Sequence, residues 1–91
     1  MKMNRQEILE ILKETVVTMD ESYAPGISEV SERTELLKDL GFSSLQMVFL
    51  VVMLEERFHI RLENLEAQNL VSIGDVIELI ETLTSGSNVE P

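Results

Sequence analysis

Eight consecutive apolar residues at positions 47–54, M-V-F-L-V-V-M-L, constrain the fold of this chain more than any other feature. The stretch is too short to span a bilayer as a helix. A buried strand is the alternative, and the valines in the stretch suit one. However, the apolar pattern continues to Phe58, which is too far for a strand, and the chain offers no second strand to pair with it. We therefore predict a helix over residues 43–58 and an all-α fold.

Two other segments carry clear helix signals. Asn4 followed by Glu7 is a capping-box pattern at the start of the first helix, and Ser72 followed by Asp75 begins the last helix in the same way. Their apolar faces, at helical spacing, consist of Ile8, Ile11, Leu12, Thr15, Val16 and Met19 in the first helix and Ile73, Val76, Ile77, Ile80 and Leu83 in the last. A weaker pattern over residues 62–70 predicts a short helix with irregular ends.

A long connection separates the first two helices. No periodicity holds over residues 20–33, where a proline and a glycine indicate a loop, and Ile27 and Val30 are available to pin this loop to the core. Residues 34–40 look like a turn or two of helix that ends at Gly41, where a left-handed backbone is usual. Connections this long are more often functional than idle.

These elements predict a small four-helix bundle, with three long helices, one short helix and a long loop between helices 1 and 2. We expect a single domain over residues 1–84, followed by a flexible polar tail over residues 85–91.

The charge of the chain restricts its partners. Seven Lys and Arg residues against 17 Asp and Glu residues leave a net charge of −10. This charge argues against nucleic acid and against an anionic membrane surface, and it favours partners that present Lys and Arg. The absence of cysteine excludes disulfides and thiolate chemistry. Because no signal-peptide stretch is visible, we expect a cytoplasmic protein. We also expect a monomer.

The predicted helix over residues 43–58 has two apolar sides. The side expected to face the core consists of Met47, Leu50, Val51, Leu54 and Phe58. The opposite side consists of Leu45, Val48, Phe49 and Val52, with Glu56 after them. A helix of this kind is either wholly buried or uses its second side for a partner. A domain this small has few elements to bury both sides, so we predict an exposed docking patch; the alternative is that the long connection covers it.

Ser44 lies at or just inside the start of this helix. A phosphate on its hydroxyl would meet unpaired backbone N–H groups and the positive end of the helix dipole. On position alone, the simpler interpretation is that Ser43 or Ser44 serves only as an N-cap.

Three stretches resemble the acyl and peptidyl carrier protein family. L-K-D-L-G-F-S-S-L over residues 37–45 resembles the family signature, in which a Leu-Gly pair precedes Asp-Ser-Leu. L-E-E-R-F-H-I over residues 54–60 and V-S-I-G-D-V-I over residues 71–77 resemble the end of the family's second helix and the start of its final helix. The resemblance spans nearly the whole chain outside the tail, in the same order.

The resemblance implies that Ser44 carries a covalent 4′-phosphopantetheine arm, installed from coenzyme A by a phosphopantetheinyl transferase. The arm would hold acyl, aminoacyl or peptidyl groups as thioesters and present them to loading and condensing enzymes of a specialised fatty-acid, polyketide or nonribosomal peptide pathway. The chain would not itself be an enzyme. The implied docking residues are Leu45, Val48, Phe49, Val52, Glu55 and Glu56.

Two departures from the family pattern bear on this expectation. Ser43 stands where the family usually has Asp, which removes a negative charge and leaves a second, less favoured acceptor hydroxyl. Phe49 stands where fatty-acid carriers have an acidic residue. We interpret this as specialisation toward apolar-surfaced partners, in polyketide or peptide biosynthesis.

The alternatives to a carrier are weaker on the residues present. His59 is the only histidine, and it is more typical of a helix-end surface residue than of a general base. No acidic loop of the calcium-binding type occurs, and we expect no metal. The main rival is a carrier-like module that is never modified and only binds other proteins.

Overall fold

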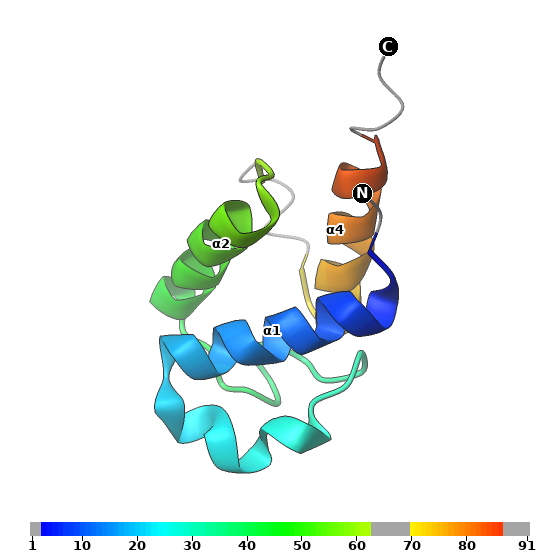
Figure 1. Cartoon of the computed structure of the whole chain (residues 1–91). Coiled ribbons are helices and arrows are strands. Elements are labelled where there is room, and N and C mark those ends of the chain that lie inside the picture. The colour runs from blue at the N-terminus through cyan, green and yellow to red at the C-terminus, as the bar shows by residue number, and fades with distance from the viewer. Residues whose placement is uncertain (1–2, 63–69, 87–91) are drawn as a thin grey trace.

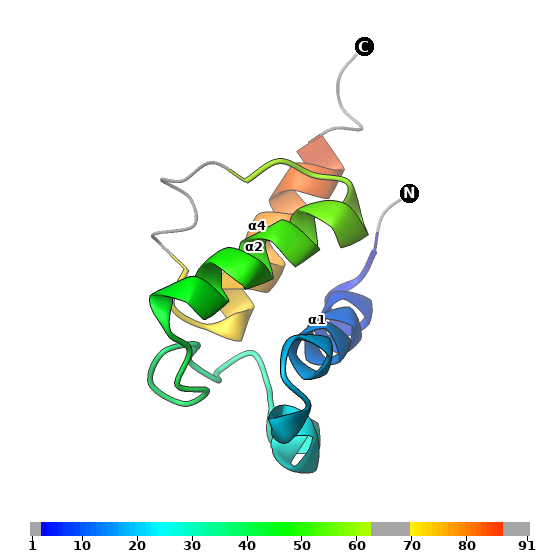
Figure 2. The same cartoon turned by 90° about the vertical axis from the view of Figure 1, so that its left-hand side faces the viewer.

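Helix α1 (Arg5–Met19) is the element that the rest of the described fold packs against. It contacts the 3-10 helix η1 (Glu21–Glu29), helix α2 (Ser44–Phe58) and helix α4 (Ile73–Gly86). In Figure 1, α2 and α4 lie on one side of α1 and η1 lies on the other. Figure 2 shows α1 nearly end-on, with α2 and α4 running in similar directions beside it.

This computed structural model describes residues 3–62 and 70–86. Within those ranges the expected all-α fold with three long helices is confirmed. The short helix predicted over residues 62–70 falls almost wholly outside the described residues. Among the helices that are described, none is both long and apolar enough to cross a membrane.

One apolar cluster joins the helices, and it follows the stripes expected from the sequence. Leu12, Leu54 and Ile77 are at most 1% exposed, so each long helix contributes fully buried side chains. The cluster consists of Ile8, Leu9, Leu12, Val16, Val30, Leu36, Phe42, Leu50, Leu54, Phe58, Leu70, Ile73, Val76, Ile77 and Ile80. The N-terminal cap of α1 is also as predicted, because the Asn4 and Glu7 side chains each accept a hydrogen bond from the other's backbone N–H.

The connection after α1 differs from the expected irregular loop. Residues 21–29 form η1, whose first turn is capped by the Asp20 carboxylate accepting from the Ser22 N–H. No residue of η1 is fully buried, so the segment leaves no apolar stripe in the sequence, and the prediction of a loop was wrong for this reason. The expected anchors are confirmed: Val30 is buried and Ile27 packs against the core.

Residues 34–40 contain no regular helix, and residues 36–39 form a turn instead of the expected one or two helical turns. The Glu35 carbonyl accepts from both the Asp39 and the Leu40 N–H groups, and the Asp39 carboxylate accepts from the Glu35 N–H. These local bonds close a single turn and compete with helix propagation. Gly41 follows with φ of 69°, the left-handed conformation expected of it.

Backbone hydrogen bonds tie this connection to the start of α4. The Leu36 N–H donates to the Val71 carbonyl at 2.9 Å, and the Gly74 N–H donates to the Glu32 carbonyl at 2.8 Å. A Cβ atom at Gly74 would lie 3.0 Å from that carbonyl oxygen, a tight contact, so a larger residue there would push the Glu32 backbone away and strain this hydrogen bond. The long connection is therefore fixed to the start of α4 by backbone hydrogen bonds.

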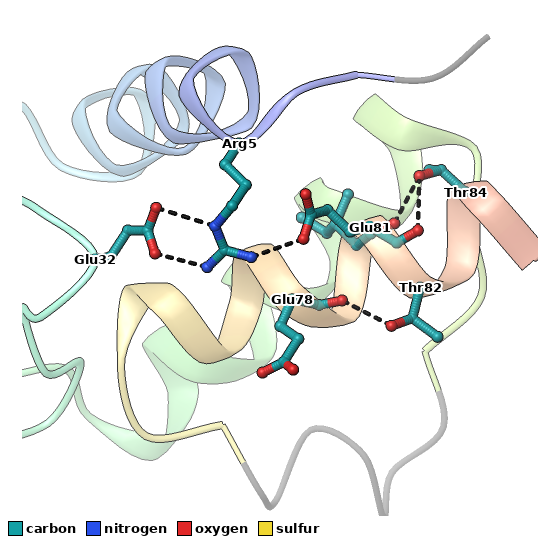
Figure 3. A network of polar contacts seen from close by, with 7 residues as sticks. Arg5, Glu32, Glu78, Glu81, Thr82 and Thr84 are labelled. Atoms are coloured by element: carbon teal, nitrogen blue, oxygen red, sulfur yellow. Dashed lines mark hydrogen bonds and ion pairs between the residues drawn. The ribbon is translucent and has the colours of Figure 1, made fainter.

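A network of charged side chains also links α1, the long connection and α4 (Figure 3). The Arg5 guanidinium donates to both carboxylate oxygens of Glu32, at 3.2 and 2.6 Å, and to Glu81 at 2.7 Å. One side chain of α1 thus joins the connection and α4. The hydrogen bonds from Arg5 hold the pKa of Glu32 below its ordinary value.

We expect Glu32→Gln to lower the melting temperature slightly at pH 7, and we expect the deficit to shrink in acid. Because the pKa of Glu32 is lower in the folded chain, its ion pair stabilises the fold above the unfolded-state pKa, about 4.3 for Glu. That contribution is lost as the pH falls through the folded-state pKa. The effect is small because both partners are 42% exposed. Thermal unfolding at pH 7 and pH 3, with exposed Glu29→Gln as control, measures it; a deficit independent of pH would contradict the assignment.

Candidate functional site

Ser44 is the first residue of α2, and Ser43 is the residue that caps the helix. The Ser43 hydroxyl accepts from the Gln46 N–H at 3.2 Å, and the Gln46 side chain accepts from the Ser43 N–H at 2.8 Å. This reciprocal pair satisfies the capping role that the sequence left open between the two serines. Ser44 is exposed, and no other residue in the described part of the chain hydrogen bonds to its hydroxyl.

The chain that leads into Ser44 is held from two sides. Phe42 is 4% exposed, and its N–H donates to the Leu36 carbonyl at 3.1 Å. The Tyr23 ring, in η1, meets the Phe42 ring edge to face at 5.6 Å, and its hydroxyl donates to the Leu40 carbonyl at 2.6 Å. This role of Tyr23 was not predictable from the sequence, because the contact joins residues that are 17 positions apart.

We expect Tyr23→Phe to cost about 1 kcal/mol of folding free energy, since it removes the hydroxyl and leaves the Leu40 carbonyl without that donor. Tyr23→Ala should cost more, because it also removes the ring from Phe42. Urea unfolding of the two variants separates the hydrogen bond from the ring contact. Equal losses in both variants would show that the ring contact contributes nothing, and no loss in Tyr23→Phe would show that the hydroxyl contributes nothing.

The two apolar sides of α2 are exposed and buried as predicted, except that Val51, expected on the core-facing side, is only half-buried. Leu50, Leu54 and Phe58 are buried, and Met47 packs partly against the core. The opposite side, here called the outer face, consists of Leu45, Val48, Phe49 and Val52, which are 62%, 55%, 52% and 45% exposed. The long connection does not cover this face, so that alternative is excluded. The outer face begins one residue after Ser44 and runs along the helix from it.

The two acidic residues expected beside that face, at the end of α2, have different surroundings. Glu56 is exposed and continues the outer face one turn beyond Val52. The Glu55 carboxylate instead accepts from the Leu62 N–H at 2.9 Å, so it orders the chain that leaves the helix. His59 closes α2 in the left-handed conformation, with φ of 56°, and is exposed as expected.

The start of α2 suits a phosphate ester. The N–H groups in the first turn of a helix have no partner within the helix, and the helix dipole is positive there. Ser43 occupies only the Gln46 N–H, and no carboxylate stands at position 43 to repel an anion. A phosphodiester on Ser44 would therefore find donors and favourable potential. In contrast, no three carboxylate or imidazole groups lie close enough to hold a metal ion within residues 3–62 and 70–86.

The fold and the site together define a class of protein: a small all-α module that presents one serine hydroxyl at a helix start, beside an exposed apolar face. Comparison with known proteins agrees with this description. Residues 24–80 match the family model described as "Phosphopantetheine attachment site".

Curated relatives and a solved structure extend the match. The chain is 40% identical to an acyl carrier protein of Wolinella succinogenes over 75 residues, covering 82% of this chain and 95% of that protein. It is 34% identical to an acyl carrier protein of Exiguobacterium over 80 residues, covering 88% of this chain and 98% of that protein. A solved candidate acyl carrier protein from Mycobacterium tuberculosis superposes with a TM-score of 0.64 at 28% identity, covering 78% of this chain and 90% of that one.

The chain belongs to the acyl carrier protein family, and it is a carrier rather than an enzyme. Its prosthetic group is a covalently attached 4′-phosphopantetheine, and its partners are phosphopantetheinyl transferases and acyl-handling enzymes in general.

Proposed function

We propose that Ser44 is the residue to which the 4′-phosphopantetheine is attached, and that this chain carries acyl, aminoacyl or peptidyl thioesters on that arm. The observation that carries the proposal is the exposed Ser44 hydroxyl at the first residue of α2, inside the segment that matches the family. Attachment would form a phosphodiester between the Ser44 oxygen and the pantetheine phosphate of coenzyme A, with 3′,5′-adenosine diphosphate as the leaving group.

Capping favours Ser44 over its neighbour as the acceptor. The Ser43 hydroxyl already accepts from the Gln46 N–H and holds the start of α2. Modification of Ser43 would disturb this cap, whereas modification of Ser44 leaves it in place. Both serines are exposed, so the difference between them is that the Ser43 oxygen accepts a hydrogen bond and the Ser44 oxygen accepts none from the described residues.

The outer face of α2 has a role in the proposed working cycle. The carrier docks on loading and condensing enzymes through the face that begins at Leu45, while the arm enters their active sites. These encounters are brief, because cargo must pass from one enzyme to the next. We place the protein in the cytoplasm, as a monomer, in a specialised fatty-acid, polyketide or nonribosomal peptide pathway.

Intact mass spectrometry tests the proposal directly. The purified chain is incubated with coenzyme A, Mg²⁺ and a promiscuous phosphopantetheinyl transferase, and the modified peptide is then mapped. We expect a gain of one phosphopantetheine, located on Ser44. A chain that stays unmodified with several transferases would instead be the unmodified protein-binding module, and the proposal would be wrong.

A further inference from the structure

We propose that Tyr23 is a positioning residue for the modification of Ser44. Its side chain bridges Gly41, the glycine with a left-handed backbone three residues before Ser44. In this way it fixes the orientation in which the Ser44 hydroxyl is presented to a phosphopantetheinyl transferase. This inference rests on the proposed function, because it concerns how the proposed attachment site is held.

The first turn of α2 has few anchors of its own. Phe42 is the last buried residue before Ser44, and Leu50, six positions after Ser44, is the first buried residue of the helix. Between them, Leu45 is exposed and Met47 is only partly buried. Because unanchored helix ends fray, the orientation of this turn depends on the chain that enters it.

Gly41 is the most permissive residue of that entering chain. Its φ is 69°, and glycine adopts this conformation about as readily as the extended or right-handed ones. A Cβ atom built on Gly41 would have no described atom within 4 Å apart from its chain neighbours, so packing around the glycine does not hold its backbone. The restraint must come from the residues on either side.

Tyr23 contacts both of those residues. Its hydroxyl donates to the Leu40 carbonyl at 2.6 Å, and its ring meets the Phe42 ring edge to face at 5.6 Å. The backbone N–H groups of Leu40 and Phe42 bond only within the connection itself. Phe42 belongs to the core cluster and Leu40 only packs against it. Tyr23 therefore ties the two sides of Gly41 together and joins them to η1.

Tyr23 is itself held in place by η1. Its N–H donates to the Asp20 carbonyl at 3.1 Å, and the Asp20 carboxylate accepts from the Ser22 N–H at 3.0 Å. Pro25 restricts the backbone two residues later, and Ile27 packs against the core. The position of the Tyr23 ring is therefore set by η1, which gives this segment a role at the attachment site.

The transfer reaction requires a well-oriented hydroxyl. The Ser44 oxygen bonds to the pantetheine phosphorus of coenzyme A, the bond from that phosphorus to 3′,5′-adenosine diphosphate breaks, and the hydroxyl proton is released. Misplacement of a reacting group by about 1 Å can cost about 100-fold in rate. Loss of the Tyr23 contacts should therefore lower kcat. KM should change little, because the exposed side chains of α2 are unaltered.

Initial rates of modification test the inference, with coenzyme A, Mg²⁺ and a promiscuous phosphopantetheinyl transferase, read by intact mass spectrometry. We expect Tyr23→Ala to lower kcat about tenfold or more and to change KM about twofold or less. Tyr23→Phe, which keeps the ring, should recover most of the rate. Circular dichroism checks that each variant is folded, and Tyr23→Leu replaces Tyr23→Ala if the alanine variant is not.

Ile80→Val is the control for stability. Ile80 is 0% exposed in α4, and removal of one of its methyl groups should destabilise the fold about as much as Tyr23→Phe does. Because Ile80 contacts no residue of the attachment segment through a described hydrogen bond, its variant should keep the kcat of the wild-type chain.

Hydrogen exchange of the unmodified chain gives a second readout that needs no transferase. The Phe42 amide donates to the Leu36 carbonyl, and its exchange should become about fivefold faster or more in Tyr23→Ala, because the segment opens more often. The Gly74 amide, which donates to the Glu32 carbonyl in another part of the connection, should change much less.

An unchanged kcat in Tyr23→Ala, an equal loss of kcat in Ile80→Val, or unchanged exchange of the Phe42 amide would overturn the inference. Failure of the proposed function gives a different result, because the wild-type chain would then gain no phosphopantetheine with any transferase. Modification of the wild-type chain with the same kcat in the Tyr23 variants would remove only the inference.

Discussion

Ser44→Ala should abolish the addition of phosphopantetheine and leave the stability of the fold almost unchanged. Ser43→Ala should still be modified, but its fold should be less stable. Alanine at position 44 removes the exposed oxygen, but it is a good residue for the first turn of a helix and disturbs no described hydrogen bond. Alanine at position 43 removes the oxygen that accepts from the Gln46 N–H, and loss of an N-cap costs about 1 kcal/mol.

The two serine variants are matched controls for each other, since they differ by one position and by the same atom. Intact mass after treatment with coenzyme A and a transferase reports modification, and thermal unfolding reports stability. Modification that persists in Ser44→Ala and disappears in Ser43→Ala would show that the acceptor is Ser43. Loss of modification in both variants, with Ser43→Ala still folded, would show that the transferase also requires the Ser43 side chain that caps α2.

The largest loss of stability should come from Leu54→Ala. Leu54 is 0% exposed and lies on the buried side of α2. Removal of a buried leucine side chain costs about 2–5 kcal/mol through lost burial and the cavity that remains. A domain of this size has about 5–15 kcal/mol in total, so the melting temperature should fall by roughly 10 °C or more.

Val52→Ala is the matched control for that prediction, because Val52 is on the same helix and 45% exposed. It should change the free energy of unfolding by about 0.5 kcal/mol or less. Urea unfolding of both variants gives the two values. Similar losses at the two positions would contradict the assignment of Leu54 to the buried side and Val52 to the exposed side of α2.

Much of the fold was predictable because local signals agreed with the tertiary structure. The apolar stretch over residues 47–54 was assigned to a helix because no second strand was available, and α2 has that structure. The capping pattern of Asn4 and Glu7 predicted the start of α1, since these contacts lie within one turn. Helical spacing also separated the buried Leu54 from the exposed Phe49.

The errors occurred where local pattern carries little information. The 3-10 helix η1 buries no residue completely, so no periodicity marked it. The two acidic residues at the end of α2 looked equivalent in the sequence, but Glu55 accepts from the backbone N–H of Leu62, whereas Glu56 is exposed and has no partner among the described residues. The partner of Glu55 is set by how the chain leaves the helix, which no spacing rule predicts.

The sequence by itself determined the all-α class, the starts of the long helices, most of the buried stripes and the resemblance that singled out Ser44, whereas α4 runs to Gly86, two residues into the predicted tail. These features depend on residues within a few turns of one another, so their spacing is sufficient to predict them. Only the tertiary structure decided which serine caps α2, whether the outer face is covered, and how Tyr23 and Arg5 hold the long connection. Those outcomes depend on contacts between segments that are distant in the sequence. Hydrogen bonds between residues as far as 76 positions apart produce no periodic pattern from which they could be predicted.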